Sequence, residues 1–70
     1  MQNNLSKLLG ERLLKVSNVH IATGISKTTL TEIYYQRAVN VQLSTLQKIC
    51  DYLGVSLSEL IEYDPKKEVN

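Results

Sequence analysis

The chain has 70 residues, of which 43% are hydrophobic and 21% charged, and its net charge is +1. This length allows one domain with a small core, and the even charge balance gives no overall field that favours nucleic acid or a membrane surface. One cysteine and one histidine argue against a disulfide within the chain and against a metal site, and the apolar runs are too short for a transmembrane span or a signal peptide. We therefore expect a cytoplasmic protein with no cofactor and no metal.

The N-terminal segment predicts a first helix from about Asn4 to Lys15. Either Asn3 or Asn4 is a suitable N-cap. Gly10 lies inside the pattern and costs roughly 1 kcal/mol relative to alanine. Leucines at helical spacing form one predicted buried stripe, which consists of Leu5, Leu8, Leu9 and Leu13.

Two helices separated by a glycine are predicted next. The first runs from about Val16 to Thr23, and Gly24 ends it, because glycine adopts the left-handed conformation without a side-chain penalty. Ser26 is a good N-cap for the second, which extends over about Lys27 to Gln36.

Short hydroxyl side chains are concentrated on the outward face of this third helix. At about 100° per residue, Leu30, Ile33 and part of Tyr34 turn inward. A solvated helix face more often carries Lys, Glu, Gln and Ala, so hydroxyls here suit a surface that approaches a partner closely; ordinary surface threonines are the alternative. Threonine can bond a base edge or a phosphate. The outward positions are Lys27, Thr28, Thr31, Glu32 and Tyr35.

The remaining chain predicts a loop over residues 36–43 and two further helices. Ser44 and Gln47 form a capping-box pattern that opens the fourth helix, and Gly54 ends it. Ser56 and Glu59 repeat the pattern before a short fifth helix. The predicted inward positions of these two helices are Leu46, Ile49, Cys50, Leu53, Leu57, Leu60 and Ile61.

Five short helices make the predicted fold class all-α, with one domain over residues 1–63 and a polar tail over residues 64–70. Charge is uneven along this domain. Residues 15–40 carry three cations against one carboxylate, a net +2, whereas residues 41–70 carry three lysines against five carboxylates, a net −2. The basic part contains the threonine-rich helix, and this direction suits nucleic acid.

The segment Val16 to Tyr35, VSNVHIATGISKTTLTEIYY, resembles the helix-turn-helix of the Cro/C1-type, phage-repressor-like (XRE) family of DNA-binding domains. Downstream, STLQKICDYLGVSLSELI (Ser44 to Ile61) is similar to the family's fourth and fifth helices, so the resemblance covers roughly residues 4–63. The TLTEIYY variant with its longer loop resembles a subgroup of small regulators from Gram-positive bacteria and their phages. The matching motif positions are Val19, Gly24, Ile25, Leu30 and Ile33.

Three features depart from the family pattern. His20 stands where the family prefers a small residue, so either its ring turns outward or the two helices sit slightly apart. Val16 takes the place of a glutamine that the family often has at the start of the second helix. The loop after the third helix, QRAVNVQL, lacks the usual glycine and proline.

The resemblance implies a lambda-repressor-like fold in which the third helix enters the major groove of DNA. Lys27 and Thr28 would reach base edges first, and lysine can donate to guanine. Thr31 and Glu32 would meet bases or the sugar–phosphate backbone, where Glu32 can accept from the amino group of cytosine; the alternative for Glu32 is solubility. Tyr35 is as well explained by packing as by DNA contact. Arg37 is the strongest of the expected backbone contacts, which are Lys15, Ser17, Ser26, Tyr35, Arg37 and Asn40.

The expected function is a transcriptional regulator that binds double-stranded DNA at an operator, most simply as a repressor acting by occupancy. One short helix gives few contacts, so we expect a homodimer on two half-sites, paired through the fifth helix or the loop from Ala38 to Val41. The alternative is a protein-interaction module, such as an antitoxin or anti-repressor, which Val39 and Val41 keep open. The absence of paired carboxylates argues against an enzyme, no small-molecule substrate is inferred, and Cys50 is expected to be an inert buried thiol.

Overall fold

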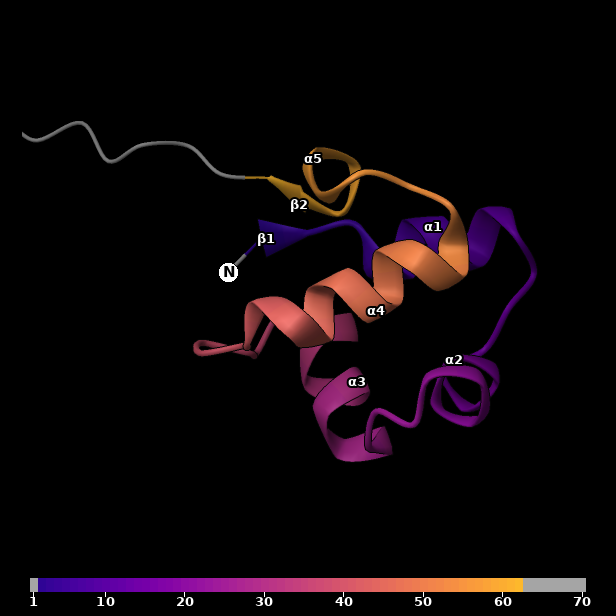
Figure 1. The fold of residues 1–70 in the computed structure, drawn as a ribbon, viewed down its shortest axis with the longest axis horizontal. Coiled ribbons are helices and arrows are strands. Elements are labelled where there is room, and N and C mark those ends of the chain that lie inside the picture. Colours follow the sequence, from indigo (N-terminus) through magenta and orange to yellow (C-terminus); the bar gives the residue numbers. More distant parts are fainter. Residues whose placement is uncertain (1, 63–70) are drawn as a thin grey trace, which may run out of the picture.

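The computed structural model describes residues 2–62, so Tyr63 and the predicted tail of residues 64–70 lie outside the described residues. Within this range the chain forms five helices and two short strands (Figure 1). In chain order they are β1 (Gln2–Asn3), α1 (Leu5–Glu11), α2 (Val16–Thr23), α3 (Lys27–Tyr34), α4 (Leu43–Leu53), α5 (Leu57–Leu60) and β2 (Ile61–Glu62). The predicted five-helix fold is confirmed, and the two strands are an addition to it.

The longest helix, α4, crosses the molecule, with α5 and the two strands on one side of it in this view and α2 and α3 on the other (Figure 1). The core between the helices is aliphatic and contains every predicted inward position of α4. Burial of one leucine or isoleucine side chain stabilises a fold by about 1.5–3 kcal/mol. Because the core is small, each of its residues contributes a large share of the stability. The buried hydrophobic residues are Leu5, Leu8, Leu9, Val19, Ile25, Leu30, Ile33, Leu46, Ile49, Cys50, Leu53 and Leu60.

Helix α1 ends at Glu11, earlier than predicted, because the backbone turns into the left-handed region at Leu13 (φ 54°). The N–H of Leu14 donates to the carbonyl of Leu9 (2.9 Å), and the N–H of Leu13 donates to that of Gly10 (3.2 Å). These two bonds are the Schellman pattern, which satisfies the last carbonyls of a helix. The turn leaves Leu13 91% exposed, so its predicted place in the buried stripe is wrong.

The ends of α4 and α5 follow the sequence signals in part. Helix α4 starts at Leu43 with Gln42 as its N-cap and without a side-chain cap, so the capping box predicted at Ser44 is wrong. Its other end is as predicted, with Gly54 in the left-handed conformation (φ 70°). The capping box that opens α5 is confirmed. Its Leu57, however, is 43% exposed rather than inward-facing.

The two strands join the ends of the described chain. They pair antiparallel, with Gln2 opposite Glu62 and Asn3 opposite Ile61. Strands of two residues are too short to show an alternating pattern, and for this reason the sequence did not indicate them. The Asn3 side chain is buried, and its Oδ1 accepts a hydrogen bond from the N–H of Leu5 (2.9 Å) at the start of α1. Of the two predicted caps, Asn3 therefore supplies the side-chain bond.

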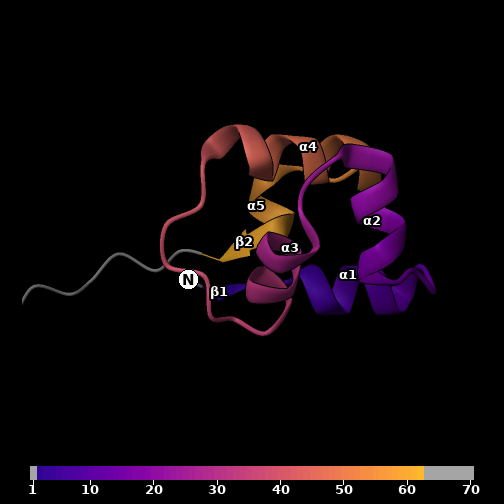
Figure 2. The same cartoon turned by 90° about the horizontal axis from the view of Figure 1, so that it is seen from below.

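Helix α3 ends at Tyr34, two residues before the predicted end, and Gln36 takes the left-handed conformation (φ 63°). The N–H of Gln36 donates to the carbonyl of Ile33 (3.0 Å), and the N–H of Arg37 donates to that of Glu32 (2.8 Å), a second Schellman turn. This turn belongs to the loop of residues 35–42, which begins and ends one residue earlier than the predicted 36–43 and extends away from the helices before α4 begins (Figure 2).

Candidate nucleic-acid interface

The connection between α2 and α3 is a tight turn built from glycine and threonine. Gly24 takes the left-handed conformation (φ 80°), and its N–H donates to the carbonyl of His20 (2.9 Å). The hydroxyl of Thr23 donates to the carbonyl of Val19 (2.6 Å) and accepts from the N–H of Ile25 (3.2 Å). The turn therefore pairs with the carbonyls of Val19 and His20 in the second half of α2 and sets the direction in which α3 leaves.

His20 belongs to this turn. Its ring is half-buried, and Nδ1 lies 2.6 Å from the carbonyl oxygen of Ile25. Because a carbonyl oxygen only accepts, Nδ1 carries the proton in this hydrogen bond. The sequence left two alternatives for His20, an outward-turned ring or two helices set slightly apart, and neither describes the outcome fully. The ring bridges the turn and joins α2 to Ile25, the residue before the α3 cap.

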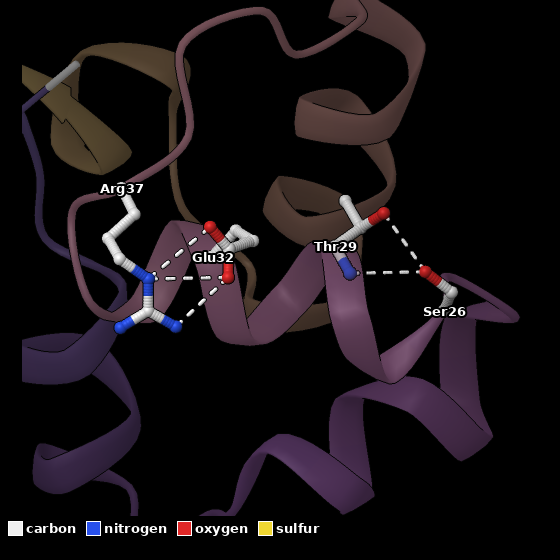
Figure 3. Close-up of polar contacts among 4 residues, drawn as sticks. All are labelled: Ser26, Thr29, Glu32 and Arg37. Atoms are coloured by element: carbon white, nitrogen blue, oxygen red, sulfur yellow. Dashed lines mark hydrogen bonds and ion pairs between the residues drawn. The ribbon is translucent and has the colours of Figure 1, made fainter.

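The start of α3 is capped as the sequence predicted. The Ser26 hydroxyl accepts from the N–H of Thr29 (3.1 Å) and donates to the Thr29 hydroxyl (2.9 Å), as Figure 3 shows. A serine cap of this kind stabilises a helix by about 1 kcal/mol relative to alanine. Thr29 itself is half-buried, and its side chain belongs to the cap.

The outward face of α3 is polar, and its first turn carries two side chains that form no hydrogen bond with other residues in the range 2–62. Lys27 and Thr28 are exposed, and within residues 2–62 neither side chain has a hydrogen-bond partner. Thr31 and Glu32, one turn further along, are half-buried. Leu30 and the other predicted inward residues of this helix hold it against the core. The first turn of α3 thus presents an ammonium and a hydroxyl group that no described residue engages.

A hollow of about 340 Å³ runs beside this face, between α3 and the start of α2. It brings together three candidates that the sequence named separately: Lys15, Thr31 and Tyr35. The other residues that line it, and that the sequence did not single out as candidates, are Leu14, Val16 and Tyr34. Their contribution depends on how α2 packs on α3, which no local pattern reveals.

The start of α2 is organised by a side chain that the sequence analysis overlooked. Asn18 Oδ1 accepts from the N–H of Lys15 (2.8 Å), while the N–H of Asn18 donates to the carbonyl of Lys15 (2.9 Å). This reciprocal pair fixes the backbone at the N-terminus of α2, and the side chain of Lys15 remains exposed. Ser17, the other predicted contact here, is half-buried. An asparagine three residues after the cap was the available signal.

Arg37, the strongest predicted backbone contact, forms an ion pair with Glu32. Its Nη2 donates to Glu32 Oε2 (2.9 Å), and Nε donates to both carboxylate oxygens (3.3 Å each), as Figure 3 shows. These hydrogen bonds and the charge of Arg37 hold the pKa of Glu32 below its ordinary value, and Glu32 in turn raises the pKa of Arg37. The guanidinium also lies 5.1 Å from the ring centre of Tyr35, so a cation–π contact adds to the arrangement.

Two remaining candidates lie at the far end of α3 and in the loop. Tyr35 is 59% exposed, and its ring meets the Tyr34 ring edge-on at 5.0 Å. Asn40 is exposed and lines a different hollow, of about 460 Å³, with Val39, Val41 and Gln42.

Groups that would indicate another kind of site are not gathered in the described part of the chain. Residues 2–62 contain no cluster of histidine, cysteine and carboxylate side chains with the composition of a metal site, and none of their helices has the length and apolarity needed to cross a membrane. Cys50 is buried, and burial, together with the nearby Asp51 and Glu59 charges, raises the pKa of its thiol. A raised pKa disfavours the reactive thiolate, as expected for a structural cysteine.

Comparison with known proteins agrees with this geometry. The family described as the Cro/C1-type HTH DNA-binding domain matches residues 4–66, which is most of the chain. The search of curated proteins finds no match. The matched range contains α2, the glycine turn and α3 in the order that a helix-turn-helix requires. This chain belongs to the Cro/C1-type helix-turn-helix family of DNA-binding domains.

Proposed function

We propose that this protein is a transcriptional regulator that recognises a specific double-stranded operator by placing α3 in the major groove. The observation that carries the proposal is the pair Lys27 and Thr28, which are exposed at the start of α3 and have no hydrogen-bond partner within residues 2–62. Unpaired polar groups on a rigid helix are available to base edges without first breaking an internal bond.

The dimensions and chemistry of α3 suit that groove. An α-helix with its side chains is about 10–12 Å across, and the groove is about 12 Å wide. Lys27 is suited to the O6 and N7 acceptors of guanine, and Thr28 offers a hydroxyl and a methyl group, which suits the thymine methyl. Thr31 lies one turn further along the same face and serves as a second polar contact. In this proposal these residues select the sequence.

Contacts to the phosphate backbone hold the protein in register. Lys15 contributes its exposed ammonium beside the N-terminus of α2, where free N–H groups and the helix dipole also attract phosphate. Ser17 supplies a hydroxyl at the start of α2, and Ser26 supplies one at the start of α3 once its proton is redirected from Thr29 to the phosphate. Tyr35 and Asn40 extend the surface past the end of α3. Such contacts position the protein and carry no direct sequence information.

We also propose that the protein acts as a homodimer and represses transcription by occupying a promoter, without catalysing a reaction. One eight-residue helix makes few base contacts, and two copies on half-sites about 34 Å apart would supply the missing affinity. Of the two predicted pairing regions, the loop is favoured by Val39, which is 82% exposed. Val41 in the same loop packs partly against the core, so it contributes less than the sequence indicated.

Exposed aliphatic side chains support a second candidate function, a protein-interaction module on the same fold. Leu13 is 91% exposed and Ile21 is 79% exposed, and side chains of this kind favour contact with another protein over contact with DNA. The polar face of α3 argues for DNA, and for this reason we place the module second.

Salt dependence of duplex binding separates the two functions. The affinity for a mixed-sequence duplex is measured at several salt concentrations, for the protein and for Lys15→Ala. Specific regulators bind mixed duplex through phosphates, so log K should fall linearly with log salt at about 0.9 per neutralised phosphate, and Lys15→Ala should lower that slope by about 0.9. Absent or salt-independent binding contradicts DNA recognition and favours the interaction module.

A further inference from the structure

The Glu32–Arg37 pair stands out because it joins the recognition helix to the residue just beyond its end. Three hydrogen bonds of 2.9–3.3 Å connect the two side chains, which are 41% and 55% exposed. Ion pairs this exposed contribute little to stability, so folding alone gives a weak reason for the arrangement. Its position beside the outward face of α3 points to a role in recognition.

The backbone places Arg37 beside Glu32 before the side chains interact. The N–H of Arg37 donates to the carbonyl of Glu32 (2.8 Å), because the left-handed residue Gln36 turns the chain back along α3. Gln36 is in turn bonded to the backbone of Asn3, so β1 holds the turn in place. The guanidinium therefore begins close to the carboxylate, and Tyr35 lies beneath it (5.1 Å).

A carboxylate on this face has two consequences for DNA. Unpaired, it would repel the phosphates; paired with a cation, it can approach them. In the major groove a carboxylate can only accept, and the amino group of cytosine is the donor that Glu and Asp contact. Glu32 keeps capacity for such a bond, because its Oε1 accepts only the longer 3.3 Å contact from Arg37 and the side chain is 41% exposed.

We propose that Arg37 is a positioning residue for base readout: it holds the Glu32 carboxylate on the outward face of α3 so that Glu32 accepts a hydrogen bond from a cytosine amino group. This inference rests on the proposed function of α3. It also assigns Arg37 a role other than that of an independent phosphate clamp, because its guanidinium is engaged by Glu32 and Tyr35 in the protein itself. Glu32 and Arg37 then act as one unit at one base pair.

The test measures binding to the duplex that the protein selects and to variants of that duplex in which each base pair is replaced in turn. The proteins are the parent, Glu32→Gln, Arg37→Ala and the double variant, with Lys48→Ala as the control for loss of an exposed cation elsewhere. The unfolding transition of each variant is measured to check that it is fully folded under the binding conditions.

We expect Glu32→Gln and Arg37→Ala to lose discrimination, by roughly tenfold, at the same C·G base pair, since one good base contact provides this much or more. Glutamine prefers adenine, so Glu32→Gln should also gain affinity for an A·T pair there. The double variant should lose no more than either single variant, and Lys48→Ala should keep the parent's preferences.

The contrary result is equally specific. If Arg37→Ala weakens binding to every duplex by the same factor and lowers the slope of log K against log salt by about 0.9, Arg37 is a phosphate clamp and the inference is overturned. It is also overturned if Arg37→Ala changes neither preference nor affinity. If the parent itself shows no base preference, the proposed function fails together with the inference.

Discussion

The side chain of Gln36 pairs with the backbone of Asn3 like a short piece of β-sheet. Gln36 Oε1 accepts from the N–H of Asn3 (3.0 Å), and Gln36 Nε2 donates to its carbonyl (2.8 Å). In return, Asn3 Nδ2 donates to the carbonyl of Ile33 at the end of α3 (2.9 Å). Residues 33 positions apart in sequence thus fasten α3 to β1.

This contact explains why a non-glycine residue occupies a left-handed position, and it predicts the effect of two substitutions. Gln36→Ala removes these two bonds and the longer one from Asn3 Nδ2 to Gln36 Oε1 (3.3 Å) while keeping a side chain at φ 63°, and should lower the free energy of unfolding by about 2–3 kcal/mol, at about 1 kcal/mol per bond. Gln36→Gly loses the same bonds but relieves the backbone, and should be the more stable of the two variants by about 1 kcal/mol. Urea unfolding of the three proteins measures both differences. A Gln36→Ala variant as stable as the parent would show that the bonds to Asn3 contribute nothing.

At Leu13, unlike at Gln36, substitution by glycine should make the protein more stable than the parent, because no side-chain bond within residues 2–62 offsets the left-handed conformation of Leu13. It lies at φ 54° with its side chain 91% exposed, so the fold gains little from the leucine. Leu13→Gly should raise the free energy of unfolding by about 0.5–1 kcal/mol, since glycine adopts this conformation without a side-chain penalty. Leu13→Ala is the matched control: it shortens the side chain, keeps the backbone cost and should stay near the parent. Thermal unfolding compares the three, and a less stable Leu13→Gly would mean that Leu13 makes a stabilising contact.

The capping box of α5 predicts a pH dependence of stability. Glu59 Oε1 accepts from the N–H of Ser56 (2.8 Å). This bond is the larger cause, and a side-chain hydrogen bond with Ser56 the smaller one, that holds the pKa of Glu59 below its ordinary value. Because folding lowers this pKa, the charged Glu59 carboxylate stabilises the folded state fully above the unfolded-state pKa of about 4.3. This stabilisation is lost as pH falls through the folded-state pKa.

Glu59→Gln should therefore be less stable than the parent at pH 7, and its deficit should be smaller at pH 3, where protonation of Glu59 begins to remove the contribution of its charge. Glu32, whose pKa is lowered by its bonds to Arg37, should behave in the same direction when changed to Gln. Denaturant unfolding at the two pH values gives the comparison. An equal deficit at both would mean that the charge of Glu59 plays no part in the cap.

Features set by nearby residues could be predicted from the sequence. Gly24, Gly54 and the caps at Ser26 and Ser56 were placed correctly, because a left-handed turn or a helix cap depends on a few adjacent residues. The inward faces of α3 and α4 followed from helical periodicity.

Features set by distant residues could not be predicted. Leu13 fits the leucine pattern, and only the turn before α2 takes its side chain out of the core. The bonds between Asn3 and Gln36 join segments with no shared local pattern. The same holds for the hollow beside Thr31, which needs the packing of α2 on α3. For Arg37, the sequence supplied the charge, but the pairing with Glu32 depends on a turn at a glutamine, where no glycine marks it.

The most direct test of the central claim is selection of bound duplexes from a random pool by the parent protein, by Lys27→Ala and by Thr28→Ala. We expect the parent to enrich one short motif, palindromic if two copies bind, and each variant to lose its preference at its own discrete position while keeping the others. Lys48→Ala, which removes an exposed cation on α4, should enrich the parent's motif unchanged. If the parent enriches no motif, or if Lys27→Ala and Thr28→Ala both enrich the parent's motif unaltered, base readout by the start of α3 is contradicted.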